Sequence, residues 1–128
     1  MIVADTDVLI DFMVGRDPGA ERVTAELSRG LLWTTAVTRF ELFSGARSVR
    51  QEKSIREMLD GIPVLDLDRE AADRAAQINR DLQTAGESIG MADSLIAGIV
   101  LSHAATLLTR NRRHFERVRG LRLAELPA

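Results

Sequence analysis

The sequence predicts an α/β fold in which a parallel sheet is covered by helices on both faces. Apolar runs of strand length alternate along the chain with helix-like segments that carry start and stop signals. The alternation continues through all 128 residues without a repeat, a linker or a low-complexity tract. We therefore predict one domain, residues 1–128, that is large enough to bury its own core.

Each element is predicted from local signals. Typical helix starts occur at Asp17-Pro18, at Thr35 or Thr38, at Ser48 and at Asp68, and glycines follow most of the helical segments. The predicted strands are 1–4, 31–34, 62–67, 106–109 and, as a fifth candidate, 121–126. The predicted helices are 8–14, 17–28, 35 or 38 to 43, 48–59, 68 to the turn at Gly86, and 91–103, the last apolar on nearly every side and hence buried.

Composition narrows the class of protein. Hydrophobic residues make up 45% of the chain and charged residues 28%, which is typical of a globular protein rather than a disordered one. Cysteine is absent, which excludes disulfides and thiolate metal sites and favours a reducing, cytoplasmic location. We expect neither a signal peptide nor a membrane partner, because the start lacks the pattern and the longest apolar run, 95–101, is too short to span a bilayer.

Carboxylates follow the first predicted strand. That strand stops at Asp5 and Asp7, in a position where α/β folds bind ligands. A charge at the rim of the core is costly unless something compensates it. The alternative is that Asp5 or Asp7 caps the next helix, which explains one acid but neither the second nor Asp11.

Three more polar residues are candidates for the same site. Asp93 lies in the first turn of the most apolar helix, Glu41 lies among aromatic residues, and Asn111 follows the fourth strand as Asp5 follows the first. Parallel strands end at one edge of a sheet, so Asp5 and Asn111 are expected to lie together. Asp93 joins them only if its helix points its N-terminus toward that edge. The alternatives are a first-turn acid at Asp93 and a capping box from Thr38 to Glu41.

Three converging acids predict a metal site. At about 5 Å and an effective dielectric of about 20, each pair repels by roughly 3 kcal/mol, so either the pKa values rise or a cation binds. Oxygen ligands without cysteine favour Mg²⁺ or Mn²⁺. His103 and His114 are expected at a helix end or on the surface. The net charge of −2 means that the surface as a whole does not attract nucleic acid. Arginines are nevertheless concentrated between residues 110 and 122, where they would contact phosphates or, alternatively, form a solvated face.

Four motifs in order resemble PIN-domain ribonuclease toxins of the VapC family: VADTDVLID, VTRFELFSGAR, IGMADSLIAG and TLLTRNRRHF. The resemblance extends from residue 1 to about residue 126. It implies a three-layer α/β/α PIN-like fold with a central parallel sheet of four to five strands. It also implies an endoribonuclease that depends on Mg²⁺, with Mn²⁺ as a substitute, and is inhibited by a VapB-type antitoxin. The expected assembly is a homodimer or a toxin–antitoxin hetero-oligomer.

The same resemblance assigns the site. Asp5 and Asp93 match the direct metal ligands, while Glu41 and Asn111 act through water and complete the catalytic set. Asp7 adds charge without binding the metal. The hydroxyls of Thr6 and Thr109 are placed to orient a carboxylate or a water, and the arginines expected to bind RNA are Arg110, Arg112 and Arg113.

Two other functions are compatible with the sequence. Asp5-Thr6-Asp7 after a strand also resembles the nucleophile motif of haloacid-dehalogenase phosphatases, with Asp5 as nucleophile. That chemistry needs a suitably placed lysine, and the only one, Lys53, falls in an exposed-looking helix. A PIN-like domain that binds RNA or protein without catalysis is the second alternative.

Overall fold

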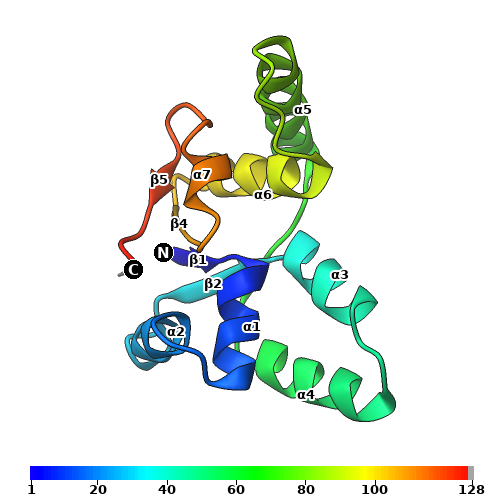
Figure 1. The fold of residues 1–128 in the computed structure, drawn as a ribbon, viewed down its shortest axis with the longest axis vertical. Helices are drawn as coiled ribbons and strands as arrows, with labels where there is room; N and C mark the ends of the chain where they lie inside the picture. The colour runs from blue at the N-terminus through cyan, green and yellow to red at the C-terminus, as the bar shows by residue number, and fades with distance from the viewer. Residues whose placement is uncertain (127–128) are drawn as a thin grey trace.

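The computed structural model describes residues 1–126, in which five parallel strands form one sheet in the order β3-β2-β1-β4-β5 (Figure 1). The strands are β1 (Ile2–Ala4), β2 (Leu32–Thr35), β3 (Val64–Leu65), β4 (Thr106–Leu108) and β5 (Arg122–Leu123). The predicted fold class is confirmed. The third and fifth strands are shorter than predicted, because each lies at an edge of the sheet and pairs on one side only.

One or two helices separate each strand from the next along the chain. They are α1 (Thr6–Val14), α2 (Gly19–Ser28), α3 (Ala36–Ser44), α4 (Val49–Asp60), α5 (Arg69–Thr84), α6 (Met91–Ser102) and the short α7 (Arg112–Phe115), which was not predicted. The side chains of Asp5, Thr35, Ser48 and Asp68 accept backbone N–H bonds at the starts of α1, α3, α4 and α5.

The structure decides one open choice of helix start and shows that another predicted start is wrong in detail. Thr35 caps α3, so the capping box from Thr38 to Glu41 does not form. Pro18 lies at the N-cap of α2 rather than at its first position, and Asp17 instead accepts the N–H of Glu21 at 3.0 Å. The predicted choice between Thr35 and Thr38 is thus decided for Thr35, whereas the start of α2 is displaced by one residue, a boundary that local sequence leaves open.

Each face of the sheet carries its own hydrophobic layer. Val3 and Leu107 pack with α5, α6 and α7, whereas Ala4 and Leu108, the next residues in the same strands, pack with α1, α2, α3 and α4. Successive side chains of a strand point to opposite faces, so this alternation shows that both faces are buried. Figure 1 shows α5 and α6 on one side of the sheet and α1, α2 and α4 on the other.

The apolar helix α6 packs closely against α5 within the monomer. A Cβ atom built on Gly98 would lie 2.6 Å from the carbonyl oxygen of Ala71 and 2.8 Å from the Cβ atom of Ala75. Gly98 therefore permits the close approach of α6 to α5 within one chain. No helix in residues 1–126 combines the length and apolar character needed to cross a bilayer.

Strand direction determines where the polar residues emerge. β1 pairs in parallel with β4, with Ala4 opposite Leu108, so Asp5 and Thr109 leave the sheet side by side. The N–H of Asp5 donates to the carbonyl oxygen of Leu108 at 2.9 Å, which extends the pairing by one residue. β2 pairs with the other side of β1 and leads directly into α3. The predicted shared edge is therefore confirmed.

Candidate active site

Asp5 is the buried centre of the acidic edge. It is 5% exposed, and its two oxygens accept the N–H of Thr6 at 2.8 Å and the hydroxyl of Thr109 at 2.7 Å. Burial, and then the charge of Asp7, raise the pKa of Asp5 to about 7. The charge of Asp93 makes a smaller contribution to this increase, and the hydrogen bonds from Thr109 and Thr6 reduce the increase without cancelling it.

Asp7 lies two residues after Asp5, in the first turn of α1. Both of its oxygens accept the N–H of Arg110, at 3.2 and 3.1 Å, and the Thr109 hydroxyl is 3.4 Å from its Oδ2. Burial raises the pKa of Asp7 as well. Its bonds to the backbone of the loop after β4 fit the predicted role of a charge close to the site that does not bind metal.

Glu41 is connected to the site through threonine hydroxyls. The hydroxyl of Thr6 donates to Glu41 Oε1 at 2.6 Å and lies 3.1 Å from the hydroxyl of Thr38. Thr6 follows Asp5 in the chain, so its hydroxyl connects Glu41 on α3 to the start of α1 directly after Asp5. The predicted orienting roles of the Thr6 and Thr109 hydroxyls are both present in this geometry.

Asp93, Asn111 and His114 form a third group. Asp93 lies in the first turn of α6, 20% exposed, and its Oδ2 accepts the amide of Asn111 at 3.1 Å. His114 Nδ1 lies 3.0 Å from the same oxygen and 2.9 Å from Asn111 Nδ2. The N–H of Asn111 in turn donates to the Thr109 hydroxyl at 2.9 Å, which links this group to Asp5. The α6 helix therefore does point its N-terminus toward the site.

His114 lies in the last turn of α7 and is 38% exposed, as expected, but its contact with Asp93 was not predicted. His114 is three residues after Asn111, and α7 brings both side chains to Asp93. The spacing of three residues was the available signal, because such residues share a helix face. It was missed because the sequence does not predict a helix as short as α7.

The predicted RNA-binding arginines differ in their contacts. Arg110 Nε donates to Asp11 at 2.7 Å, and Arg112 donates to the carbonyl oxygen of Ala124 at 2.7 Å and lies 3.6 Å from Glu116. Arg113 is exposed. Arg110 and Arg112 are thus engaged within the chain, and Arg113 is the one of the three whose side chain extends into solvent without such a contact in residues 1–126.

The donor set fits a hard cation with few protein ligands. Within residues 1–126, no group of three or more His, Asp or Glu side chains is arranged to hold a metal ion, so the predicted convergence of Asp5, Glu41 and Asp93 into a three-acid metal site is not confirmed. Mg²⁺ generally keeps several waters and binds one or two carboxylates directly, and its ligands are oxygens. Asp5 and Asp93, with an amide and hydroxyls around them, provide donors of this kind, and the raised pKa of Asp5 shows that its charge lacks compensation.

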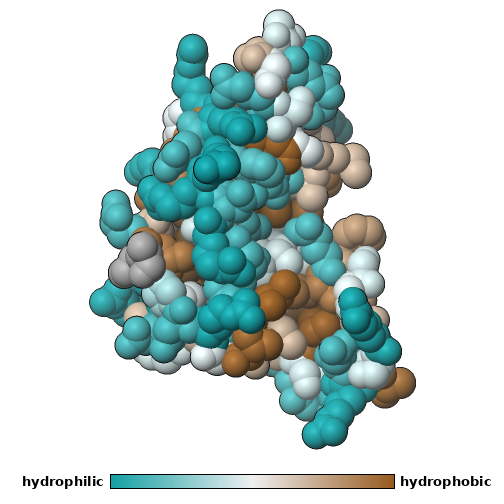
Figure 2. Space-filling view, viewed as in Figure 1, coloured by the Kyte–Doolittle hydropathy of each residue, from teal (hydrophilic) through white to brown (hydrophobic). Residues whose placement is uncertain are grey.

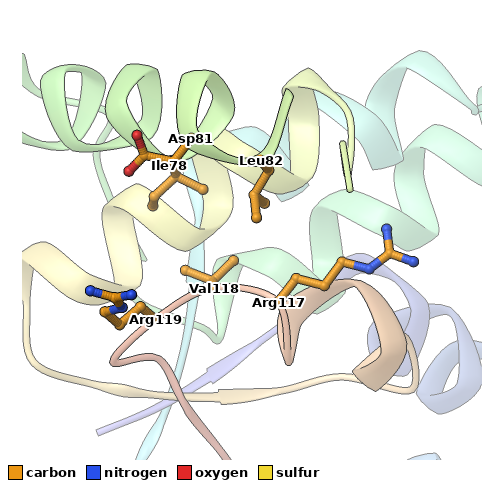
Figure 3. Close-up of a pocket in the computed structure, with 6 residues that line it drawn as sticks. All are labelled: Ile78, Asp81, Leu82, Arg117, Val118 and Arg119. Carbon is orange, nitrogen blue, oxygen red and sulfur yellow. The ribbon is translucent and has the colours of Figure 1, made fainter. Parts of the chain in front are cut away.

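Another hollow in the surface lies away from these acids. It has a volume of about 360 Å³ and lies between the end of α5 and the segment that follows α7 (Figure 3). Its lining consists of Ile78, Asp81, Leu82, Arg117, Val118 and Arg119. It contains none of the predicted site residues, so the candidate site rests on the acids at the sheet edge.

Comparison with known proteins agrees with this geometry. Residues 2–121 match the PIN domain family. The chain is 34% identical over 122 residues to the tRNA(fMet)-specific endonuclease VapC of Shigella flexneri, with 92% of each chain covered. This chain belongs to the PIN domain family, in its VapC group. The chain is also 30% identical over 125 residues to the tRNA(fMet)-specific endonuclease VapC of Salmonella typhimurium, with 94% of each chain covered.

A solved structure supports the same assignment. The DNA-bound VapBC complex of Salmonella typhimurium contains a chain with a TM-score of 0.82 and 28% identity to this PIN domain, with 96% of each chain covered. Membership in the PIN family decides against the haloacid-dehalogenase interpretation of Asp5-Thr6-Asp7. Lys53, which that chemistry would require at the site, is exposed on α4.

The raised pKa of Asp5 predicts how stability depends on pH. Between its ordinary pKa of 3.8 and about 7, the folded chain retains a proton that the unfolded chain has released, so raising the pH destabilises the fold. We expect the free energy of unfolding of Asp5→Asn, relative to wild type in the presence of EDTA, to increase from pH 5 to pH 8. One pKa unit corresponds to about 1.4 kcal/mol, so the gain reaches a few kcal/mol.

Urea denaturation at both pH values measures this difference. Asn keeps an oxygen that can accept the N–H of Thr6, so the helix cap is preserved in the variant. A wild type that is as stable as Asp5→Asn at pH 8, or a difference that does not change with pH, would contradict the raised pKa.

Proposed function

We propose that this PIN domain is a metal-dependent endoribonuclease, the toxin of a VapBC-type pair. The observation that carries the proposal is the buried Asp5, joined through Thr109 and Asn111 to Asp93, at the carboxyl edge of a parallel sheet. Relatives named as VapC endonucleases and ribonucleases support cleavage of RNA. Two of them are named for tRNA(fMet), which makes that RNA the first substrate to test.

The residues divide the work as follows. Asp5 and Asp93 would hold a Mg²⁺ or Mn²⁺ ion directly, with Glu41 and Asn111 acting through water. When bound, the ion would polarise the phosphodiester and lower the pKa of a bound water. Thr109 holds the Asp5 carboxylate, and Asn111 and His114 hold that of Asp93, so neither has to reorganise.

Glu41 is the proposed proton acceptor. The attacking water would form a new P–O bond as the opposite P–O bond breaks. The water proton would pass to Glu41, and the released ribose oxygen would take a proton from solvent to become a free hydroxyl. The Thr6 hydroxyl donates to one Glu41 oxygen and thereby orients the carboxylate. Arg113, exposed beside Asn111, is the proposed phosphate contact.

Removal of a metal-binding carboxylate should abolish cleavage. We expect Asp5→Asn and Asp93→Asn to lower the cleavage rate of transcribed tRNA(fMet) by at least about a hundredfold, since changes to groups that only support metal ligands already cost 10- to 100-fold. Mg²⁺ or Mn²⁺ should also raise the melting temperature of the wild type more than that of either variant. The cleavage rate is measured from the accumulation of cut tRNA(fMet), whose ends are identified by sequencing. The melting temperature is measured by thermal scans.

Asp73→Asn is the matched control, because Asp73 is an exposed acid on α5 outside the site. It should cleave and bind metal as the wild type does. Near-normal cleavage by Asp5→Asn would contradict the assignment of the site. Equal toxicity of the wild type and Asp5→Asn on induced expression would instead favour a domain that binds without catalysis.

The proposed antitoxin partner has a suitable surface beside the site. A groove of about 280 Å³ lies between α1, α3 and α4, and its lining includes Thr6, Glu41, Met13 and Val14. Val14 is 61% exposed. Figure 2 shows apolar surface gathered where these helices meet. Solved relatives are VapBC and FitAB complexes, so we propose that an apolar segment of a VapB-type antitoxin occupies this groove.

A charge placed in the groove should weaken the complex. We expect Val14→Glu to lower affinity for the cognate antitoxin at least tenfold, because the glutamate would have to be desolvated against apolar side chains. Val49→Glu is the control, because Val49 is 85% exposed at the start of α4 and does not line the groove. Calorimetric titration measures both; equal loss, or no loss, in the two variants would exclude this groove as the docking surface.

A further inference from the structure

The proposed mechanism leaves two buried carboxylates, Asp11 and Glu26, without a function, and Asp11 is the one that contacts a residue of the site. Asp11, on the α1 face toward α2, is 1% exposed. Its Oδ2 accepts Nε of Arg110 at 2.7 Å, while its Oδ1 lies 3.5 Å from Nη1 of Arg16 and has no hydrogen-bond partner in residues 1–126. Burial of a carboxylate is costly unless a partner compensates it, so this ion pair with Arg110 holds both residues in place.

Gly19 leaves space for the side chain of Asp11. A Cβ atom on Gly19, at the start of α2, would lie 2.4 Å from Asp11 Oδ2. Glycine at this position therefore lets α2 approach while the carboxylate stays directed at Arg110. The contact with Asp11 is also the main cause of a raised pKa of Arg110, as expected for a guanidinium held against a carboxylate.

Arg110 is attached to α1 twice. Its side chain binds Asp11, and its backbone N–H binds both oxygens of Asp7. The residue before it, Thr109, donates to Asp5, and the residue after it, Asn111, donates to Asp93. A shift of Arg110 would thus move both neighbours, which contact the two proposed metal-binding carboxylates.

We propose that Asp11 is a positioning residue of the active site, which fixes the loop of residues 109–111 on α1 through its ion pair with Arg110. This inference rests on the proposed nuclease function for its effect on catalysis, but the placement of the loop can be tested without activity. It also assigns Arg110 to the internal structure of the site rather than to contact with RNA phosphates.

The variants are Asp11→Asn, Arg110→Gln and the double variant. We expect each to lower kcat for tRNA(fMet) about tenfold or more while KM changes less than about threefold, because displaced supporting groups impair a site without removing substrate contacts. The double variant should be no slower than the slower single variant, since both changes break one interaction. Amide hydrogen exchange at Arg110 and Asn111 should become faster in all three.

Glu26→Gln is the matched control. Glu26 is also 1% exposed and is also paired with two arginines, Arg22 and Arg29, but it lies on α2 and contacts no residue of the site. It should lower stability without changing kcat or the exchange of Arg110 and Asn111. A general loss of stability would affect Glu26→Gln and Asp11→Asn alike.

Two results would overturn the proposal. If Arg110→Gln raises KM and reduces its salt dependence while Asp11→Asn changes neither kcat nor exchange, Arg110 contacts RNA directly. If exchange at Arg110 and Asn111 is unchanged in Asp11→Asn, the loop does not depend on this ion pair. Faster exchange in a chain without cleavage of tRNA(fMet) would retain the role of Asp11 in fixing the loop and reject the proposed substrate or activity.

Discussion

The charge on Asp5 is the constraint on which the rest of the site depends. Its carboxylate lies at the end of a buried strand, next to Asp7 and within the electrostatic range of Asp93, and two hydrogen bonds do not offset this environment. Selection for stability alone would replace such a group, because an uncompensated buried charge is unfavourable. A function that requires a cation at this position accounts for its presence.

The polar residues around Asp5 are organised as two supports. On one side, Thr6 connects the start of α1 to Glu41 on α3; on the other, Thr109 and Asn111 connect the end of β4 to Asp93 on α6. Each support begins directly after a central strand, where the backbone is most firmly held. The pairing of β1 with β4 therefore positions the side chains of the site. Close packing at Gly98 positions α6, which carries Asp93, against α5.

Much of the site could be predicted because it follows from strand direction. Asp5 and Asn111 each follow a strand, and parallel pairing alone brings them to one edge. His114 and the pair of Asp11 with Arg110 could not be predicted in the same way. The contact of His114 depends on a helix of four residues, and Asp11 and Arg110 are 99 residues apart, so their pairing depends on how α1, α2 and the loop after β4 pack. Edge strands β3 and β5 were predicted too long for a similar reason, since tertiary pairing limits them rather than their apolar sequence.

The most direct measurement is the titration of the Asp5 carboxyl carbon by NMR, with and without saturating Mg²⁺. Without metal we expect a midpoint close to 7, because burial and neighbouring acids favour the protonated form. With Mg²⁺ the midpoint should fall by several units, since a bound cation favours the carboxylate. A midpoint near the ordinary value of 3.8 that Mg²⁺ leaves unchanged would contradict a site organised around this buried charge.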